Sequence, residues 1–146
     1  MIKAEGLRIG DIVRINENDS IKNGLIGKVT DIDSLREYKE KKGAITLNTI
    51  EDDGWYWGIW CCDIEPIPLT PELLEKNGWK KRTEGWYFMM ISKYMYLSVE
   101  FGYENGIRVF LKRATDGLYV KLNTANNVHE LQHILWALGK DANLKI

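Results

Sequence analysis

The residues with the clearest capacity for chemistry lie near the C-terminus. The segment Asn126–Lys140 contains H-E-x-x-H at His129, Glu130 and His133, and these are the only two histidines of the chain. Histidines four residues apart share one face of a helix and can bind the same zinc ion, while the glutamate between them activates a metal-bound water. The pattern is that of a zinc-dependent hydrolase.

A catalytic zinc ion needs a third protein ligand, and this segment supplies none at a usual spacing. After His133 the only acidic residue is Asp141, which follows the predicted helix, so a carboxylate would have to come from far upstream, such as Glu84 or Glu100. We therefore favour a structural role for the segment and expect no bound metal and no cofactor. The zinc hydrolase, with His129 and His133 as ligands and Glu130 as base, remains the alternative.

The structural interpretation is an amphipathic helix that closes a small domain. Asn127 and Glu130 have the spacing of a capping pair, which starts the helix at about Val128, and Gly139 ends it. At helical spacing the apolar residues form one stripe that is expected to cover a sheet, at Val128, Leu131, Ile134, Leu135 and Leu138. The opposite side carries four residues that are expected to face away from this core or toward a second neighbour, His129, Gln132, His133 and Trp136.

Composition indicates a folded protein with almost no net charge. Hydrophobic residues make up 45% of 146 residues, and the formal net charge of −1 gives no general attraction to nucleic acid or anionic lipid. The N-terminus does not resemble a signal peptide and no apolar run is long enough to cross a bilayer, so the cytoplasm is the expected location, without membrane association. The adjacent Cys61 and Cys62 are read as reduced thiols on opposite faces of one strand.

Short strands joined by glycine turns fill the first half of the chain. The expected strands are Leu7–Ile15, Leu25–Ile32, Ala44–Ile50 and Trp55–Ile64, with a tight turn at Asp52-Asp53-Gly54. Ser34–Lys42 is predicted to be an exposed, helix-tolerant excursion. The spacing and the opening G-D-I-V-R-I resemble small SH3-like barrels, so residues 1–65 are predicted to form an SH3-like β-barrel subdomain.

A proline-rich seam at residues 66–70 separates this subdomain from the rest, because its two prolines enforce extended backbone. Thr70 and Pro71 then start a short helix that Gly78 ends. Hairpin turns follow, and an antiparallel meander of about four strands is expected at Gly85–Ile91, Tyr94–Phe101, Ile107–Lys112 and Leu118–Leu122. Residues 71–146 therefore form a helix–meander–helix subdomain, and the fold class is α+β.

Three ordered segments resemble a known family: LRIGD at Leu7–Asp11, PIPLT at Pro66–Thr70, and VHELQ at Val128–Gln132. They are similar to the motifs of an uncharacterised family of small proteins from gut bacteria and their phages and prophages. The resemblance implies an accessory role in a phage or mobile element and no particular chemistry. That family has glutamine at the place of Glu130 and a non-ligand at the place of His133, which implies that H-E-x-x-H is here a coincidence.

Within the same motif, His129 and Gln132 lie three residues apart on one helix face. This spacing suits hydrogen bonds to the backbone of the barrel or the seam. The interpretation assigns both residues to structure or binding, and not to catalysis.

Aromatic residues supply the remaining candidate site. Trp55, Trp57 and Trp60 lie on one predicted strand, where alternation puts Trp55 and Trp57 on the same face. The favoured function is a non-catalytic binding module for a protein partner, which docks on these tryptophans or on the side of the last helix with His129, Gln132 and Trp136. A nucleic-acid-binding barrel, assisted by basic residues that otherwise form a solvated loop, is a further alternative (Lys76, Lys80, Lys81 and Arg82).

Overall fold

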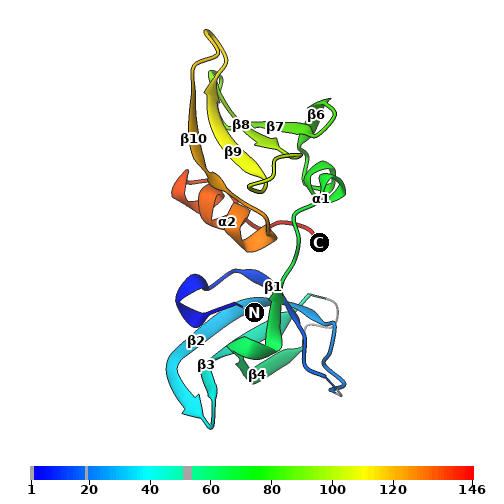
Figure 1. Ribbon diagram of the computed structural model, residues 1–146, viewed down its shortest axis with the longest axis vertical. Helices are drawn as coiled ribbons and strands as arrows, with labels where there is room; N and C mark the ends of the chain where they lie inside the picture. The colour runs from blue at the N-terminus through cyan, green and yellow to red at the C-terminus, as the bar shows by residue number, and fades with distance from the viewer. Residues whose placement is uncertain (1, 19, 51–53) are drawn as a thin grey trace. The chain divides into compact units, whose positions relative to one another are not determined.

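The computed structural model describes residues 2–18, 20–50 and 54–146. The chain divides into two compact units, Met1–Ile67 and Pro68–Ile146, and each contains one five-stranded antiparallel sheet (Figure 1). Two α-helices lie in the described part of the second unit. The predicted α+β class is confirmed, and the division between the units falls inside the 66–70 segment.

The first unit contains five strands in the order β4-β3-β2-β1-β5. A short 3₁₀ turn at Cys61–Asp63 separates β4 from β5, and another lies near the N-terminus at Ala4–Gly6. The strands are β1 (Ile12–Ile15), β2 (Ile26–Tyr38), β3 (Lys41–Thr49), β4 (Trp55–Trp60) and β5 (Ile64–Pro66).

Alternation along these strands buries one face of the first sheet. Side chains that are at most 4% exposed include Val13, Ile15, Val29, Ile45, Leu47, Ile59 and Ile64. The first strand begins at Ile12 and not at Leu7, because Gly10 has a φ of 98° and turns the chain before it. Arg8 donates its backbone N–H to Asp11 Oδ2 at 2.8 Å, which stabilises that turn.

The predicted excursion at Ser34–Lys42 is exposed but is not helical. It is the end of a long β2–β3 hairpin, which turns at Lys39 with a φ of 53°. Lys42 Nζ lies 3.3 Å from Glu37 Oε1 across the hairpin. The helix-tolerant prediction was wrong because cross-strand pairing, and not local propensity, decides the conformation of this charged segment.

The predicted strand Trp55–Ile64 is interrupted. Cys61 and Cys62 lie in the 3₁₀ turn, so they do not occupy opposite faces of one strand as predicted. Cys61 is buried and Cys62 half-buried, and both are free thiols. The predicted turn at Asp52-Asp53-Gly54 has its two aspartates outside the described residues.

The second unit contains five strands in the order β10-β9-β8-β7-β6. Four of them correspond to the predicted meander: β7 (Trp86–Met90), β8 (Met95–Glu100), β9 (Arg108–Arg113) and β10 (Tyr119–Thr124). The fifth, β6 (Lys80–Thr83), occupies the segment predicted to be a solvated loop. All four residues of β6 are exposed, so the strand has no buried face that alternation could reveal.

Both helices begin as their capping residues predict. Helix α1 (Pro71–Lys76) has Pro71 in its first turn, and Thr70 Oγ1 accepts a hydrogen bond from the Leu73 N–H at 3.3 Å. Helix α2 (Val128–Ala137) starts with a capping box of Asn127 and Glu130. Gly78 and Gly139 follow the two helices with φ values of 80° and 65°, a conformation that glycine adopts without strain.

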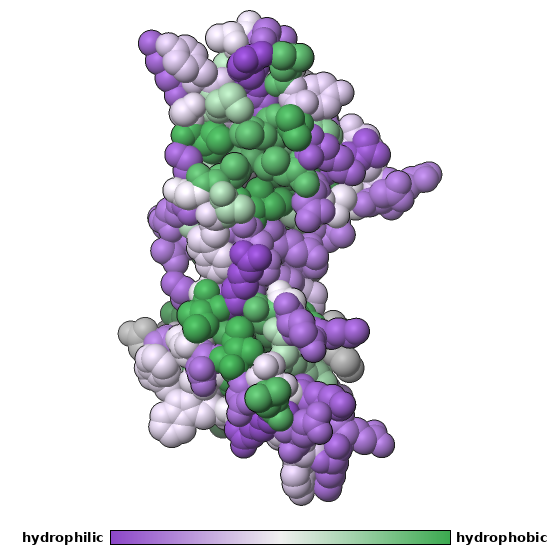
Figure 2. All heavy atoms as spheres, turned by 90° about the vertical axis from the view of Figure 1, so that its left-hand side faces the viewer, coloured by the Kyte–Doolittle hydropathy of each residue, from purple (hydrophilic) through white to green (hydrophobic). Residues whose placement is uncertain are grey.

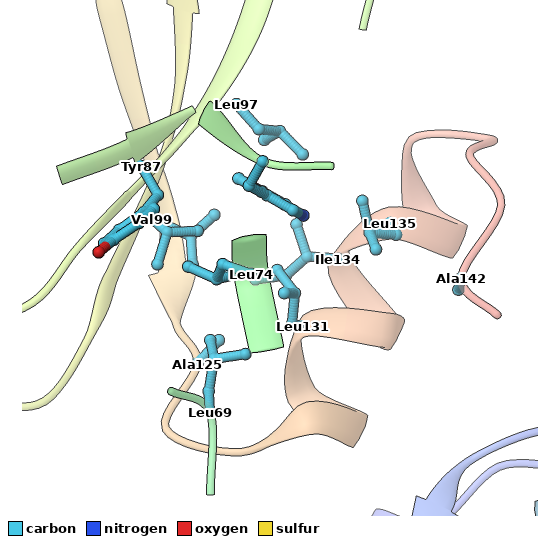
Figure 3. Close-up of a cluster of buried hydrophobic side chains, with 12 residues drawn as sticks. Leu69, Leu74, Tyr87, Leu97, Val99, Ala125, Leu131, Ile134, Leu135 and Ala142 are labelled. Atoms are coloured by element: carbon cyan, nitrogen blue, oxygen red, sulfur yellow. The ribbon is translucent and has the colours of Figure 1, made fainter. Parts of the chain in front are cut away.

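Helix α2 covers one face of the second sheet. Leu131, Ile134 and Leu135 project toward the sheet residues Leu97 and Val99, as Figure 3 shows, and all five belong to one buried cluster. Leu131, Ile134 and Leu135 of the predicted stripe thus pack against the sheet. Among the described residues, no helix has both the length and the apolar character that a bilayer crossing requires.

The other side of α2 is buried at two of its residues. Gln132 is 1% exposed and His129 is 7% exposed. Gln132 Nε2 donates to the carbonyl of Ala142 at 2.9 Å, so the chain after the helix returns over this side of α2. One partner of Gln132 is thus the C-terminal segment.

Candidate functional site

The glutamate of H-E-x-x-H is part of the helix cap. Glu130 Oε2 accepts hydrogen bonds from the backbone N–H groups of Asn126, at 2.7 Å, and Asn127, at 3.1 Å. These donors belong to the start of α2, where the helix dipole also favours a negative charge. The carboxylate that would activate a zinc-bound water is therefore engaged with the backbone.

The two histidines lie close together but in different surroundings. Their ring centroids are 5.9 Å apart in an edge-to-face arrangement, and His129 is buried while His133 is half-buried. The His133 ring stacks on Trp136 with centroids 5.7 Å apart. In the described ranges, no group of three or more histidine, cysteine, aspartate or glutamate side chains is arranged to hold a metal ion. The hydrolase thus gains no support from the positions of its proposed ligands.

The structure separates the predicted binding residues of α2. His129 and Gln132 are buried, whereas His133 lines an open groove between α2 and β10 and Trp136 is half-buried. The groove has a volume of about 430 Å³, and its apolar lining comes from Leu122, Ile134, Ala137 and Leu138. A ligand can therefore reach the His133 side of this helix, but not Gln132 without displacing the C-terminal segment.

Strand β4 brings its three tryptophans to one face. Trp55 is 58% exposed and Trp57 75% exposed. The pairing with β3 shifts within β4, since Tyr56 lies opposite Leu47 but Ile59 lies opposite Ile45. This bulge adds one residue at Trp57-Gly58, and Gly58 has a φ of 67° there. The extra residue places Trp60 on the same outer side as Trp55 and Trp57.

Arg36 completes this surface. Its guanidinium carbon lies 5.3 Å from the Trp60 ring centroid, within cation–π range. A Cβ at Gly58 would lie 3.1 Å from Arg36 Nη1, so the missing side chain of Gly58 leaves room for the guanidinium. We call Trp55, Trp57, Trp60 and Arg36 the tryptophan face. Sequence reasoning missed Arg36, because nothing in its charged neighbourhood links it to Trp60, 24 positions further along the chain.

Ionisable groups fix the turn at the end of β4. Lys41 Nζ lies 2.7 Å from Asp63 Oδ2, and this hydrogen bond raises the pKa of Lys41. Burial raises the pKa of both the Cys61 and the Cys62 thiol. A raised pKa reduces the thiolate fraction at neutral pH, so neither cysteine has the character of an activated nucleophile.

The basic cluster is spread over α1 and β6, and part of it is engaged within the chain. Lys76 Nζ donates to the backbone carbonyl of Ile146, and Lys81 Nζ lies 2.8 Å from Glu84 Oε2. Lys80 and Arg82 are exposed on β6. Three of its four residues thus belong to an exposed strand at the edge of the second sheet.

Comparison with protein-family models, curated proteins and solved structures finds no match for this chain. The candidate site therefore depends on its own geometry, in which the tryptophan face is the most exposed aromatic surface of the first unit.

Proposed function

We propose that this chain is a non-catalytic binding module whose first unit, an SH3-like barrel, presents the tryptophan face to a protein partner. The observation that carries the proposal is the exposure of Trp55 and Trp57 on the same face of β4. The strand order β4-β3-β2-β1-β5 and the 3₁₀ turn before β5 support the SH3-like assignment.

A partner that covers this surface is favoured, because it removes apolar indole area from water. Large indole rings bury about 150–250 Å² each when covered, and tryptophan and arginine are enriched among the residues that dominate binding energy. Arg36 adds a fixed positive charge beside Trp60. The partner therefore offers apolar side chains to the indoles and an acidic or carbonyl oxygen to the guanidinium.

The resemblance of the LRIGD, PIPLT and VHELQ segments to proteins of gut bacteria and their phages supports an accessory role in a phage or mobile element. The engagement of Glu130 in the helix cap supports a role without catalysis.

The hydrolase alternative is tested separately. Near-stoichiometric zinc in untagged protein, lost in His133→Ala, would favour it.

A matched pair of variants tests the tryptophan face. Trp55→Ala with Trp57→Ala removes the two exposed indoles, and Tyr94→Ala removes a similarly exposed aromatic residue (54%) from the second unit. The proteins are immobilised and the partners retained from host lysate are quantified by mass spectrometry. We expect a partner that binds wild type and Tyr94→Ala but binds the double variant at least about thirtyfold more weakly, as for a hot spot of about 2 kcal/mol.

Circular dichroism checks that the double variant stays folded, which its exposed positions predict. A partner set that is the same for wild type and the folded double variant would contradict the proposal.

A further inference from the structure

The two edges of the second sheet differ in character. The edge strand β6 consists of four exposed residues, three of them cationic, which is a usual protection against pairing with another chain. The opposite edge, at β10, is less protected: Lys121 is its one cationic residue, next to a register shift against β9, whereas Leu118, Tyr119 and Val120 are 62%, 65% and 63% exposed. Apolar side chains exposed in succession on an edge strand are suited to pairing with a further strand.

The backbone N–H and C=O groups of β10 are also oriented as such pairing requires. Arg113 donates its N–H to the carbonyl of Leu118 at 2.8 Å. Hydrogen bonds alternate along an antiparallel pair, so the N–H and C=O of Val120 face β9, where Val120 pairs with Leu111. Those of Tyr119 and Lys121 then face the outer edge. In the part of the chain that the structure describes, no strand pairs with β10 on that side.

We propose that β10 pairs antiparallel with β10 of a second copy of this chain, about a two-fold axis at Val120. The two sheets then join into one continuous sheet. In this register Tyr119 lies opposite Lys121 of the second copy, and these are the residues whose backbone groups face outward. Val120 lies opposite Val120, and Leu118 lies opposite Leu122.

In this register, the side chains of one copy are complementary to those of the other copy. Val120 is on the α2 side of the sheet, next to Leu111, which packs against the core. There Val120 of one copy covers Val120 of the other, and Leu118 reaches toward Leu122 in the apolar groove. Figure 2 shows hydrophobic residues gathered on the side of the second unit that carries β10 and α2. A second copy therefore covers apolar surface that α2 leaves exposed.

On the face of the sheet opposite α2, an aromatic ring of one copy lies opposite a cation of the other copy. Tyr119 packs edge to face on Phe110, with centroids 5.6 Å apart, and Lys121 of the second copy lies opposite Tyr119. An axis at Lys121 would place two lysines directly opposite each other, which is destabilising. An axis at Tyr119 would place Lys121 opposite Gly117, which has no side chain to contact. The axis at Val120 avoids both.

Sedimentation equilibrium of the full chain tests the interface. Val120→Lys puts two lysines opposite each other at the axis, and Met90→Lys introduces the same charge at a similarly exposed position (51%) on β7, inside the sheet. We expect wild type and Met90→Lys to dimerise with similar affinity, and Val120→Lys to dimerise at least about tenfold more weakly. Circular dichroism confirms that each variant is folded.

Cysteine substitution tests the register. Residues in a non-hydrogen-bonded antiparallel pair have Cα atoms about 4.5 Å apart, within the range of a disulfide. Val120→Cys is therefore expected to form a covalent dimer on mild oxidation, whereas wild type, with only Cys61 and Cys62, and Tyr119→Cys are not. A monomeric wild type, or a dimer that Val120→Lys leaves unchanged, overturns the proposal. Cross-linking through Tyr119→Cys in place of Val120→Cys overturns the two-fold axis at Val120.

Discussion

At the scale of single residues, Glu130 decides between the two interpretations of the C-terminal helix. A zinc hydrolase requires its carboxylate beside a metal-bound water. In the structure, Glu130 Oε2 instead accepts from two N–H groups that precede the helix, those of Asn126 and Asn127. The carboxylate of a capping box accepts from the backbone N–H at the N-cap in this way, so it satisfies donors that would otherwise need water.

Replacing Glu130 should therefore affect stability. We expect Glu130→Ala to lower the free energy of unfolding by about 1 kcal/mol, the usual cost of removing a helix cap. Urea denaturation followed by circular dichroism measures the change, with Glu104→Ala, in an exposed turn, as the control. A stability equal to wild type would contradict the capping role of this side chain.

At the scale of elements, the face of the second sheet opposite α2 contains a buried ion pair. Glu100 is 3% exposed, and its carboxylate accepts from Lys112 Nζ at 2.5 Å and from Tyr103 Oη at 3.2 Å. Lys112 Nζ lies 4.4 Å from the Trp86 ring centroid. Aromatic rings thus cover part of this face, and they shield a charge pair between β8 and β9.

Breaking this pair should cost far more than breaking an exposed one. Glu100→Gln leaves the Lys112 ammonium buried without its counter-charge, and we expect a loss of about 3 kcal/mol in the free energy of unfolding. Glu84→Gln removes the 93%-exposed partner of Lys81 and is expected to have no measurable effect. Urea denaturation of the two variants side by side measures the difference. Equal midpoints would show that the Glu100 site is as hydrated as the surface.

At the scale of the whole molecule, each unit has a core of its own. One buried cluster draws its residues from Ile2 to Ile64, and the other draws its residues from Leu69 to Ala142. Residues of the predicted seam are divided between the units: Leu69 is buried in the second core, and its N–H donates to the Asn126 carbonyl at 2.8 Å. The seam is therefore partly an element of the second unit.

A fragment comprising residues 68–146 should consequently fold alone. It retains the whole cluster around Leu97, Val99 and Leu131, and chains of this size can bury a core sufficient for stability. We expect a cooperative thermal transition by circular dichroism, with the near-ultraviolet signal of packed aromatic residues. A fragment that lacks both would show that its core depends on the first unit.

The sequence alone determined the features that depend on local pattern. Alternation of apolar residues predicted most of the strands, and Thr70-Pro71 and Asn127-Glu130 predicted where the helices begin, because caps and turns act over a few residues. These signals sufficed for the α+β class and for placing Trp55 and Trp57 on one face.

Only the tertiary structure decided contacts between residues that are distant in the chain. The bulge opposite β3 places Trp60 beside Trp57, and pairing with β7 makes a strand of the charged segment Lys80–Thr83. Gln132 is buried where it donates to the carbonyl of Ala142, ten residues further along the chain. Periodicity specifies that a side chain has a buried or exposed face, but the identity of its partner follows from packing, which no local pattern encodes.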